Sequence, residues 1–152
     1  MRFPSFIFLL LILPVFISCN NKLDNEIKVL LDSRKTAFEE KNTEKYSNLI
    51  LSTYNVETRS GNKNKEDVIK DFKLNTTPFD SIEMTHSDRK VQDENGKAKV
   101  VQKTSVLLAI EDQKTTYDIT EVLILEKEDG KWKISKESSL DLFRGFVFGK
   151  QN

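Results

Sequence analysis

The amino-acid sequence predicts an α+β domain in which N-terminal helices pack against a curved antiparallel sheet. Up to Pro78, apolar residues recur at the spacing of amphipathic helices, and after Pro78 they alternate with polar residues as in half-buried strands. Turn-forming residues separate the alternating stretches, which favours strands joined by hairpins. The 134 residues from Cys19 onward are enough for one compact domain and too few for two.

Helices are expected before Pro78. The first has an apolar stripe at the spacing i, i+4, i+7 and i+8, formed by Leu23, Ile27, Leu30, Leu31, Arg34 and Phe38. Asn42 is expected to cap a second helix that carries Tyr46, Leu49, Ile50 and Tyr54. The polar residues 55–65 predict a loop, or a short strand with a turn. Asn64 then caps a third helix, whose buried stripe is Val68, Ile69 and Phe72.

At least four antiparallel strands are expected after Pro78. On the first strand, one face carries Ile82, Met84, His86 and Asp88, and the second strand lies within residues 100–110. The third strand presents Tyr117, Ile119, Leu123 and Leu125 on one face, and the last presents Trp132 and Ile134. The turns between them are predicted at residues 93–96, 111–114 and 128–131, where Asp, Asn, Gly and Lys gather.

Residues 1–18 have the pattern of an export signal that is removed from the mature protein. Arg2 and the amino terminus supply positive charge, and Phe6–Ile17 is a nearly unbroken apolar run. The run is shorter than the ~20 apolar residues of a membrane-spanning helix and has the length of a signal-peptide core. Ordinary cleavage needs small residues before the cut, and Phe16 or Ile17 would occupy one of those positions.

The segment Phe16–Cys19 resembles the lipobox of bacterial lipoproteins, in the relaxed form found in spirochaetes. The resemblance implies that Cys19 is lipidated, that residues 19–22 form a short lipidated tether, and that acyl chains make the membrane a partner. The alternative is a chance thiol at the end of an ordinary signal. Because Asn20 rather than Asp follows the cysteine, similarity to enterobacterial sorting favours the outer over the inner membrane of the cell envelope.

Composition excludes several classes of function. Lys+Arg and Asp+Glu both number 24, so no net charge attracts the protein to nucleic acid. One cysteine and one histidine allow neither an intramolecular disulfide nor a zinc site built from three or four such ligands. No nucleotide-binding, metal-binding or nucleophile motif occurs, and we therefore expect no cofactor and no metal.

The order of elements resembles the nuclear transport factor 2-like superfamily, which is also called cystatin-like or polyketide-cyclase-like. Two local features carry the resemblance: the leading helix pair around residues 38–49, and the closing hairpin Glu128–Ile134 with its Asp-Gly-Lys-Trp turn. The resemblance spans residues 23–139 and implies a cone-shaped fold with a cavity at the open end of its sheet. The superfamily includes enzymes and non-enzymatic binding or dimerising domains, so the fold does not define an activity.

Three ionisable residues are candidates for acid–base chemistry. Glu121 stands among apolar residues, so it would either be buried with a raised pKa or reach solvent at the sheet margin. We expect the margin, because buried unpaired carboxylates are rare. His86 and Asp88 could form an acid–base pair, but residues i and i+2 of a strand lie ~7 Å apart. We therefore expect the core to end at Met84 and both side chains to be in water.

Other residues are candidates for ligand binding. Those that would line a cavity are Tyr46, Tyr54, Gln102, Thr104, Tyr117 and Trp132. The two polar side chains would supply hydrogen bonds, whereas the aromatic ones either line a pocket or fill the core. The tail 140–152 is apolar for a terminus and would add an edge strand, cover the mouth of the cone or join a homodimer interface.

Three functions follow as hypotheses. The favoured one is a membrane-anchored, non-enzymatic module that binds a small apolar ligand or another envelope protein, since the N-terminal signal is strong and catalytic motifs are absent. The second is an enzyme of the isomerase or cyclase type, which requires His86, Asp88 and Glu121 to converge in one closed cavity. The third is a structural surface lipoprotein without a pocket.

Overall fold

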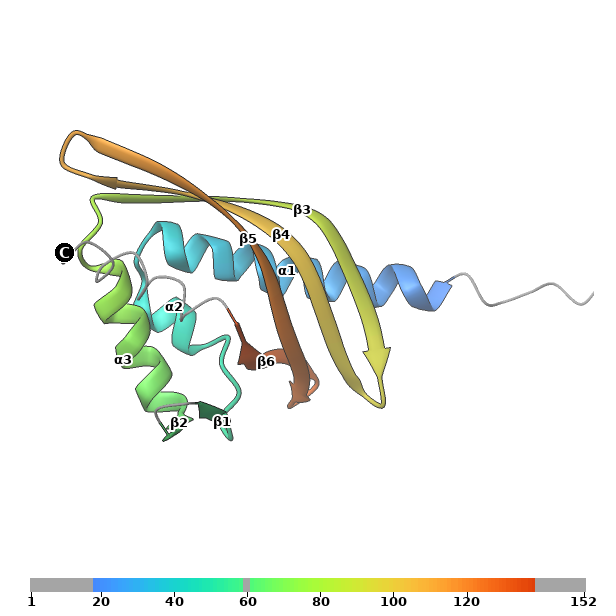
Figure 1. The fold of residues 1–152 in the computed structure, drawn as a ribbon. Coiled ribbons are helices and arrows are strands. Elements are labelled where there is room, and N and C mark those ends of the chain that lie inside the picture. The colour runs from blue at the N-terminus through green and yellow to red at the C-terminus, as the bar shows by residue number, and fades with distance from the viewer. Residues whose placement is uncertain (1–17, 59–60, 139–152) are drawn as a thin grey trace, which may run out of the picture.

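The computed structural model describes residues 18–58 and 61–138. The elements are α1 (Ser18–Glu39), α2 (Thr43–Ser47), β1 (Asn55–Thr58), β2 (Gly61–Asn64), α3 (Lys65–Thr76), β3 (Ser81–Glu94), β4 (Lys97–Ile110), β5 (Gln113–Glu128) and β6 (Lys131–Glu137). Strands β3 to β6 form one antiparallel sheet in sequence order, and β1 pairs with β2. The sheet curves around α1, while α2 and α3 lie at one end of it (Figure 1). This confirms the predicted α+β class.

Helix α1 buries the predicted stripe against the concave face of the sheet, where Ile27 and Phe38 are fully buried. It ends in a Schellman motif, in which the backbone N–H of Asn42 donates to Ala37 (2.8 Å) and that of Lys41 donates to Phe38 (3.1 Å). Lys41 takes the left-handed conformation that this motif requires (φ 53°). Its Nζ donates to the backbone oxygen of Phe79 (2.8 Å), which ties the end of α1 to the segment before β3.

The expected tether 19–22 is helical, because α1 begins at Ser18. The side chain of Cys19 lies outside the described residues, as do residues 1–17 and 139–152. The signal peptide, the lipidation and the role of the apolar tail therefore stay predictions. None of the helices within residues 18–58 and 61–138 is long and apolar enough to cross a membrane.

The second helix is shorter than predicted. Asn42 caps it as expected, with its Oδ1 accepting from the Lys45 N–H at 2.9 Å, but the helix ends at Ser47. The next segment bonds to β6 instead: Ile134 N–H donates to Leu49 (2.8 Å), and Leu51 N–H donates to Ile134 (3.0 Å). The spacing of apolar residues cannot distinguish such a bridge from a further helical turn, because a short apolar run is compatible with either structure.

Local signals for the third helix and the turns are confirmed. Asn64 and Asp67 form a capping box, in which each side chain accepts from the other residue's backbone N–H (3.0 and 3.1 Å). Residues 55–64 form the β1–β2 hairpin. The sheet strands break at residues 95–96, 111–112 and 129–130, inside the three predicted turns.

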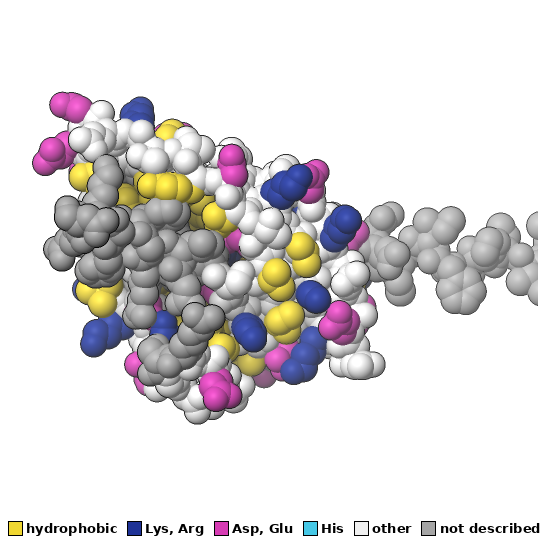
Figure 2. All heavy atoms as spheres, viewed as in Figure 1, with side chains coloured by type: hydrophobic (Ala, Val, Ile, Leu, Met, Phe, Trp, Pro, Cys, Tyr) yellow, Lys and Arg dark blue, Asp and Glu magenta, His cyan; other side chains and the backbone are white. Residues whose placement is uncertain are grey.

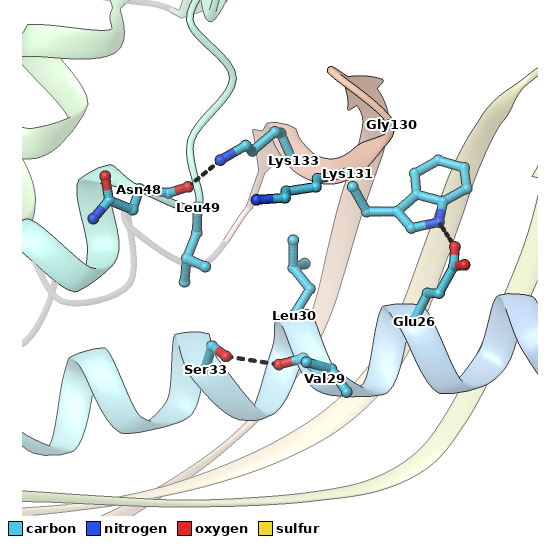
Figure 3. Close-up of a pocket in the computed structure, with 10 residues that line it drawn as sticks. Glu26, Val29, Leu30, Ser33, Asn48, Leu49, Gly130, Lys131 and Lys133 are labelled. Carbon is cyan, nitrogen blue, oxygen red and sulfur yellow. Dashed lines mark hydrogen bonds between the residues drawn. The ribbon is translucent and has the colours of Figure 1, made fainter.

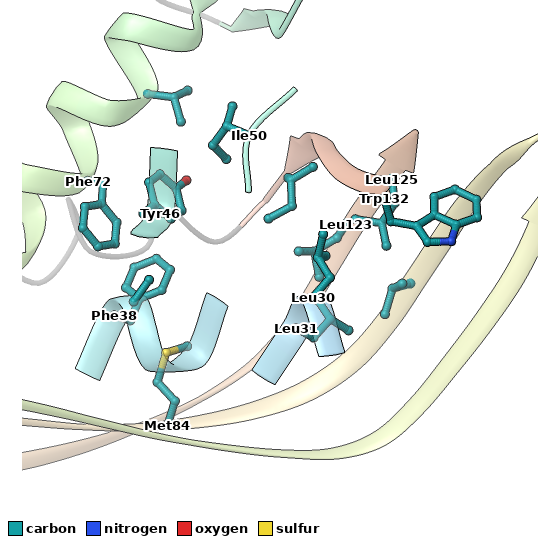
Figure 4. Close-up of a cluster of buried hydrophobic side chains, with 14 of the residues drawn as sticks. Leu30, Leu31, Phe38, Tyr46, Ile50, Phe72, Met84, Leu123, Leu125 and Trp132 are labelled. Carbon is teal, nitrogen blue, oxygen red and sulfur yellow. The ribbon is translucent and has the colours of Figure 1, made fainter. Parts of the chain in front are cut away.

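The hydrophobic core lies between the helices and the concave sheet face (Figure 4). At one end, the rings of Tyr46 and Phe72 stack at 4.1 Å between centroids, and Phe38 contacts both edge-on. Toward the other end, Leu30 and Leu31 of α1 lie near side chains of β5 and β6. The packing of α1 on the sheet places Arg34 against the carboxylates of Glu121 and Glu137.

Candidate functional site: a buried ion network and an open groove

A buried ion network connects α1 with the interior of the sheet. The Arg34 guanidinium donates from Nη2 to Glu121 Oε1 (3.0 Å) and from Nε to Glu137 Oε2 (2.8 Å). The side chains of all three residues are at most 1% exposed. The Tyr46 hydroxyl donates to the other oxygen of Glu137. One cation is thus held between two carboxylates in the middle of the domain.

Glu121 does not reach solvent at the sheet margin, and that expectation is wrong. Its residue exposure is 0%, and its second carboxylate oxygen accepts from Gln102 Nε2 (3.0 Å) and Thr104 Oγ1 (2.5 Å). Burial acts to raise the pKa of Glu121, but Arg34 and these two donors outweigh it and bring the pKa to about 2. The carboxylate is therefore ionised, and the groups around it stabilise that charge.

Arg34 stands in the predicted apolar stripe of α1, and the sequence pattern alone did not identify a carboxylate that would pair with it. An arginine at such a position is the signal that predicts a buried carboxylate opposite, because charged side chains are almost never buried unpaired. Burial acts to lower the pKa of Arg34, and Glu121 and Glu137 together raise it above its ordinary value. Burial, followed by the charge of Glu137, raises the pKa of Tyr46, which therefore donates as a neutral phenol.

Glu137 points inward because of a bulge. The pairing of β5 with β6 shifts between Ile124 and Leu125, so that Leu123 pairs with Glu137 while Leu125 pairs with Ile134. Strict alternation from Ile134 would have placed Lys136 on the inner face instead. The periodicity of the sequence therefore carries no signal for Glu137.

His86 lies at the edge of the same network, and the expectation that it is in water is wrong. Its side chain is 8% exposed, and its Nδ1 lies 2.8 Å from Thr104 Oγ1 and 3.2 Å from Gln102 Nε2. The distance from Nδ1 to Glu121 Oε2 is 3.9 Å. Burial lowers the pKa of His86 below its usual value, against the opposing effect of Glu121.

A bulge in β3 separates Asp88 from His86. The register with β4 shifts between Ser87 and Lys90, and Asp88 takes a left-handed conformation (φ 51°). Asp88 is exposed, as expected, and its carboxylate pairs with Lys103 Nζ at 2.7 Å, which lowers the pKa of Asp88. His86 and Asp88 line one open hollow at the surface, but Glu121 is bonded within the packed interior. The three candidate acid–base groups therefore do not converge in one closed cavity.

The predicted ligand-binding residues divide between the interior and a groove. Those in the interior are Tyr46 and Tyr54 in the core, Gln102 and Thr104 in the ion network, and Tyr117 packed against the core's edge. Only Trp132 of the predicted set lines the groove described next.

The α1–β6 groove is an open hollow between the N-terminal half of α1, the segment after α2 and the β5–β6 turn (Figure 3). Its volume is about 690 Å³. In Figure 3, Leu30 and Leu49 point toward one another across it, and Lys131 and Lys133 reach over it from β6. The residues that line it are Glu26, Val29, Leu30, Ser33, Asn48, Leu49, Gly130, Lys131, Trp132 and Lys133.

Apolar, cationic and acidic side chains are interspersed on this face of the molecule (Figure 2). Val29 is 67% exposed at the side of the groove, whereas Trp132 is 9% exposed. The indole Nε1 of Trp132 donates to Glu26 Oε2 at 3.1 Å, and Lys127 Nζ lies 3.7 Å from the same oxygen. The Lys127 ammonium also lies 5.0 Å from the centre of the Trp132 ring. These contacts hold the indole in place at the end of the groove.

Two smaller hollows border His86. One, of about 480 Å³, lies between α1 and β3, and the other, of about 460 Å³, is lined by residues of β3, β4 and β5. Both are lined mainly by polar and charged side chains, whereas the α1–β6 groove combines apolar side chains with polar and charged ones. Across residues 18–58 and 61–138, no group of three or more His, Cys, Asp or Glu side chains is placed to hold a metal ion.

No protein-family profile and no curated protein sequence matches this chain. Solved structures do match it in shape. A putative dehydratase of the nuclear transport factor 2-like family from Streptomyces avermitilis is 13% identical with a TM-score of 0.68, over 78% of this chain and 94% of the other. A cystatin-like protein of unknown function from Nostoc punctiforme is 18% identical with a TM-score of 0.62, over 79% and 90%.

A hexachlorocyclohexane dehydrochlorinase is 14% identical with a TM-score of 0.65, over 78% of this chain and 84% of the other. Identities this low bear on the fold alone, since the fold is shared by proteins of unrelated function. Together with the helices and the curved four-stranded sheet, they show that this chain has the nuclear transport factor 2-like α+β fold.

Proposed function

We propose that the protein is a membrane-anchored bacterial lipoprotein whose domain binds a small apolar ligand in the α1–β6 groove, without catalysis. The observation that carries the proposal is the groove itself, with a volume of about 690 Å³ and Leu30, Leu49 and Trp132 among its lining residues. Small-molecule sites have volumes of about 300–1,000 Å³ and are lined mainly by apolar and aromatic side chains with a few polar groups.

The arrangement of exposed apolar residues favours a small ligand over another envelope protein. A stable protein interface buries about 800 Å² on each partner around an apolar centre. The large exposed hydrophobic residues of the described part of the chain are Val29, Leu74 and Ile110, which lie on α1, α3 and β4. They do not share one element, and only Val29 borders the groove.

The ion network makes Glu121 unsuited to act as a general base. Glu121 is ionised and accepts from Arg34, Gln102 and Thr104, so its lone pairs are engaged by groups of the protein itself. A general base needs a lone pair within reach of a substrate proton. The network instead connects α1 to β4, β5 and β6, and it holds the helix that forms one wall of the groove.

The membrane anchor would place the groove close to the bilayer. Helix α1 includes Cys19 and continues through Glu26 and Leu30, which line the groove. At 1.5 Å per residue, Glu26 lies about 10 Å along the helix axis from Cys19. Two or three acyl chains on Cys19 would hold the protein on the membrane, since each buried methylene contributes about 0.8 kcal/mol.

Metabolic labelling tests the anchor. Cells that express the full chain are grown with an alkyne-tagged palmitate, and the protein is captured and coupled to a dye. We expect the wild-type protein to be labelled and to sediment with membranes, and Cys19→Ser to be unlabelled. Label on Cys19→Ser, or an unlabelled wild-type protein free in the periplasm or medium, would contradict the anchor.

The single tryptophan of the sequence provides a test of the groove, because Trp132 lines it. Energy transfer from Trp132 to the neutral dye N-phenyl-1-naphthylamine should saturate as the dye fills the groove. Val29→Asp should weaken dye binding, because the apolar dye would have to displace water from a carboxylate at the border of the groove.

The matched control is Leu74→Asp, which changes a residue of similar exposure (60%, against 67% for Val29) on α3, outside the groove. It should leave dye binding unchanged. Equal affinities for the two variants, or energy transfer that never saturates, would refute binding at this site.

A further inference from the structure

We infer that the α1–β6 groove takes a long-chain carboxylate, a fatty acid, whose chain lies on the apolar floor and whose head group is held by Lys131 and Lys133. The inference rests on the proposed binding function and adds the chemical class of the ligand. It is carried by the charges at the rim of the groove and by their position relative to the apolar side chains.

The apolar part of the groove is suited to an alkyl chain. Leu30 and Leu49 face one another across it, whereas Val29 borders it with a largely exposed side chain that points away from these two (Figure 3). Trp132 also lines the groove, and its Nε1 donates to Glu26. A flexible chain laid on this surface would remove apolar area of both partners from water, and that is the non-directional driving force for binding.

The rim of the groove has an excess of positive charge. Lys133 Nζ donates to the backbone oxygen of Asn48, a neutral acceptor, and Lys131 is exposed beside it. Within the described residues, neither ammonium is paired with a carboxylate. The acidic residue that lines the groove, Glu26, already accepts from Trp132 and lies 3.7 Å from Lys127. Lys133 also interacts with the carboxylate of Glu128, whose pKa it helps to lower after the hydrogen bonds from Ser52. The lining of the groove still holds two lysines against the single acid Glu26, and this excess is complementary to a ligand with one anionic end.

The experiment compares an acid with its neutral ester. Bromine atoms quench tryptophan at short range, so 9,10-dibromostearate and its methyl ester report directly on occupancy beside Trp132. With the intact mature domain at pH 8, we expect the acid to bind at least about tenfold more tightly than the ester, as a charge-assisted contact provides. Lys131→Gln/Lys133→Gln should reduce the affinity for the acid to that of the ester and leave the ester unaffected.

Lys114→Gln is the matched control, because Lys114 is an exposed lysine at the start of β5, outside the groove. It should bind both ligands as the wild-type protein does. Added salt gives a second measurement that needs no variant: it should weaken binding of the acid and not of the ester, through screening of the exposed lysines.

The outcomes separate the two proposals. Equal affinities of the wild-type protein for acid and ester would overturn the fatty-acid inference and leave an apolar groove in place. An unchanged preference for the acid in Lys131→Gln/Lys133→Gln would also overturn it. Failure of both ligands to quench Trp132 would overturn the groove as a binding site, and with it the inference.

Discussion

Replacing Arg34 with methionine should be among the most damaging single changes in the domain. The guanidinium bonds both Glu121 and Glu137, and all three side chains are buried. Arg34→Met keeps much of the apolar stem but leaves two carboxylates without their counter-ion. Breaking a buried ion pair by removing one partner destabilises a protein by about 3–5 kcal/mol, which for a domain of this size lowers Tm by roughly 10–20 °C.

Urea unfolding at pH 7, followed by circular dichroism, measures this loss. The control Lys28→Met removes an ion pair of similar length (Lys28 Nζ to Asp32 Oδ2, 2.7 Å) that is exposed on the same helix. It should change the free energy of unfolding by less than about 0.5 kcal/mol. If Arg34→Met loses less than 1 kcal/mol, the network does not hold α1 to the sheet.

Two further measurements test whether the charges of the buried ion network stabilise the fold. Adding Glu121→Gln and Glu137→Gln to Arg34→Met should recover part of the lost stability, because the uncompensated charges are removed. In the wild-type protein, Glu121 has a pKa of about 2, so its contribution is complete above the unfolded value of about 4.3 and is lost as pH falls toward 2. Without Arg34 the pKa rises, and the deficit of the variant should shrink as pH falls below about 4.3.

Two other changes have expected outcomes. Burial lowers the pKa of His86 in the folded state, so as pH falls the unfolded chain takes up the proton first, near pH 6.5. The free energy of unfolding of the wild-type protein should therefore decrease below about pH 6.5, and the decrease should be smaller in His86→Gln. A pH profile of unfolding that is the same for both proteins would contradict the burial of the imidazole. Asn64→Ala removes the capping box of α3 and should lower the free energy of unfolding by about 1 kcal/mol, whereas Asn62→Ala, on exposed β2, should change little in the same urea titration.

Features encoded locally could be predicted from the sequence. The capping box of Asn64 and Asp67, the Asn42 cap and the hairpin turn at Gly130 depend on residues a few positions apart, so their sequence signals coincide with the structure. The overall order of helices and strands follows from periodicity for the same reason. The second helix was overestimated because Ile50 is buried by a bridge to Ile134, which is distant in the sequence.

The candidate site was less predictable, because it depends on irregularities and on long-range packing. A bulge in β3 moves Asp88 away from the inner sheet face, where strict alternation of side chains would place it. A register shift between β5 and β6 places Glu137 on the inner face. Glu121 could have been assigned to the interior once Arg34 was seen as a charge within an apolar stripe. The α1–β6 groove combines three separate segments, and Trp132 was identified without its neighbours.

A ligand that binds in the α1–β6 groove would lie beside Trp132. Because the sequence has one tryptophan, biosynthetic incorporation of 5-fluorotryptophan gives a protein with a single fluorine resonance from the indole. Titration with stearate should move that resonance in a saturable way. The ring signals of His86, which does not line the groove, should stay in place. A fluorine resonance that stays fixed while the His86 signals move would place the ligand elsewhere and contradict binding in the α1–β6 groove.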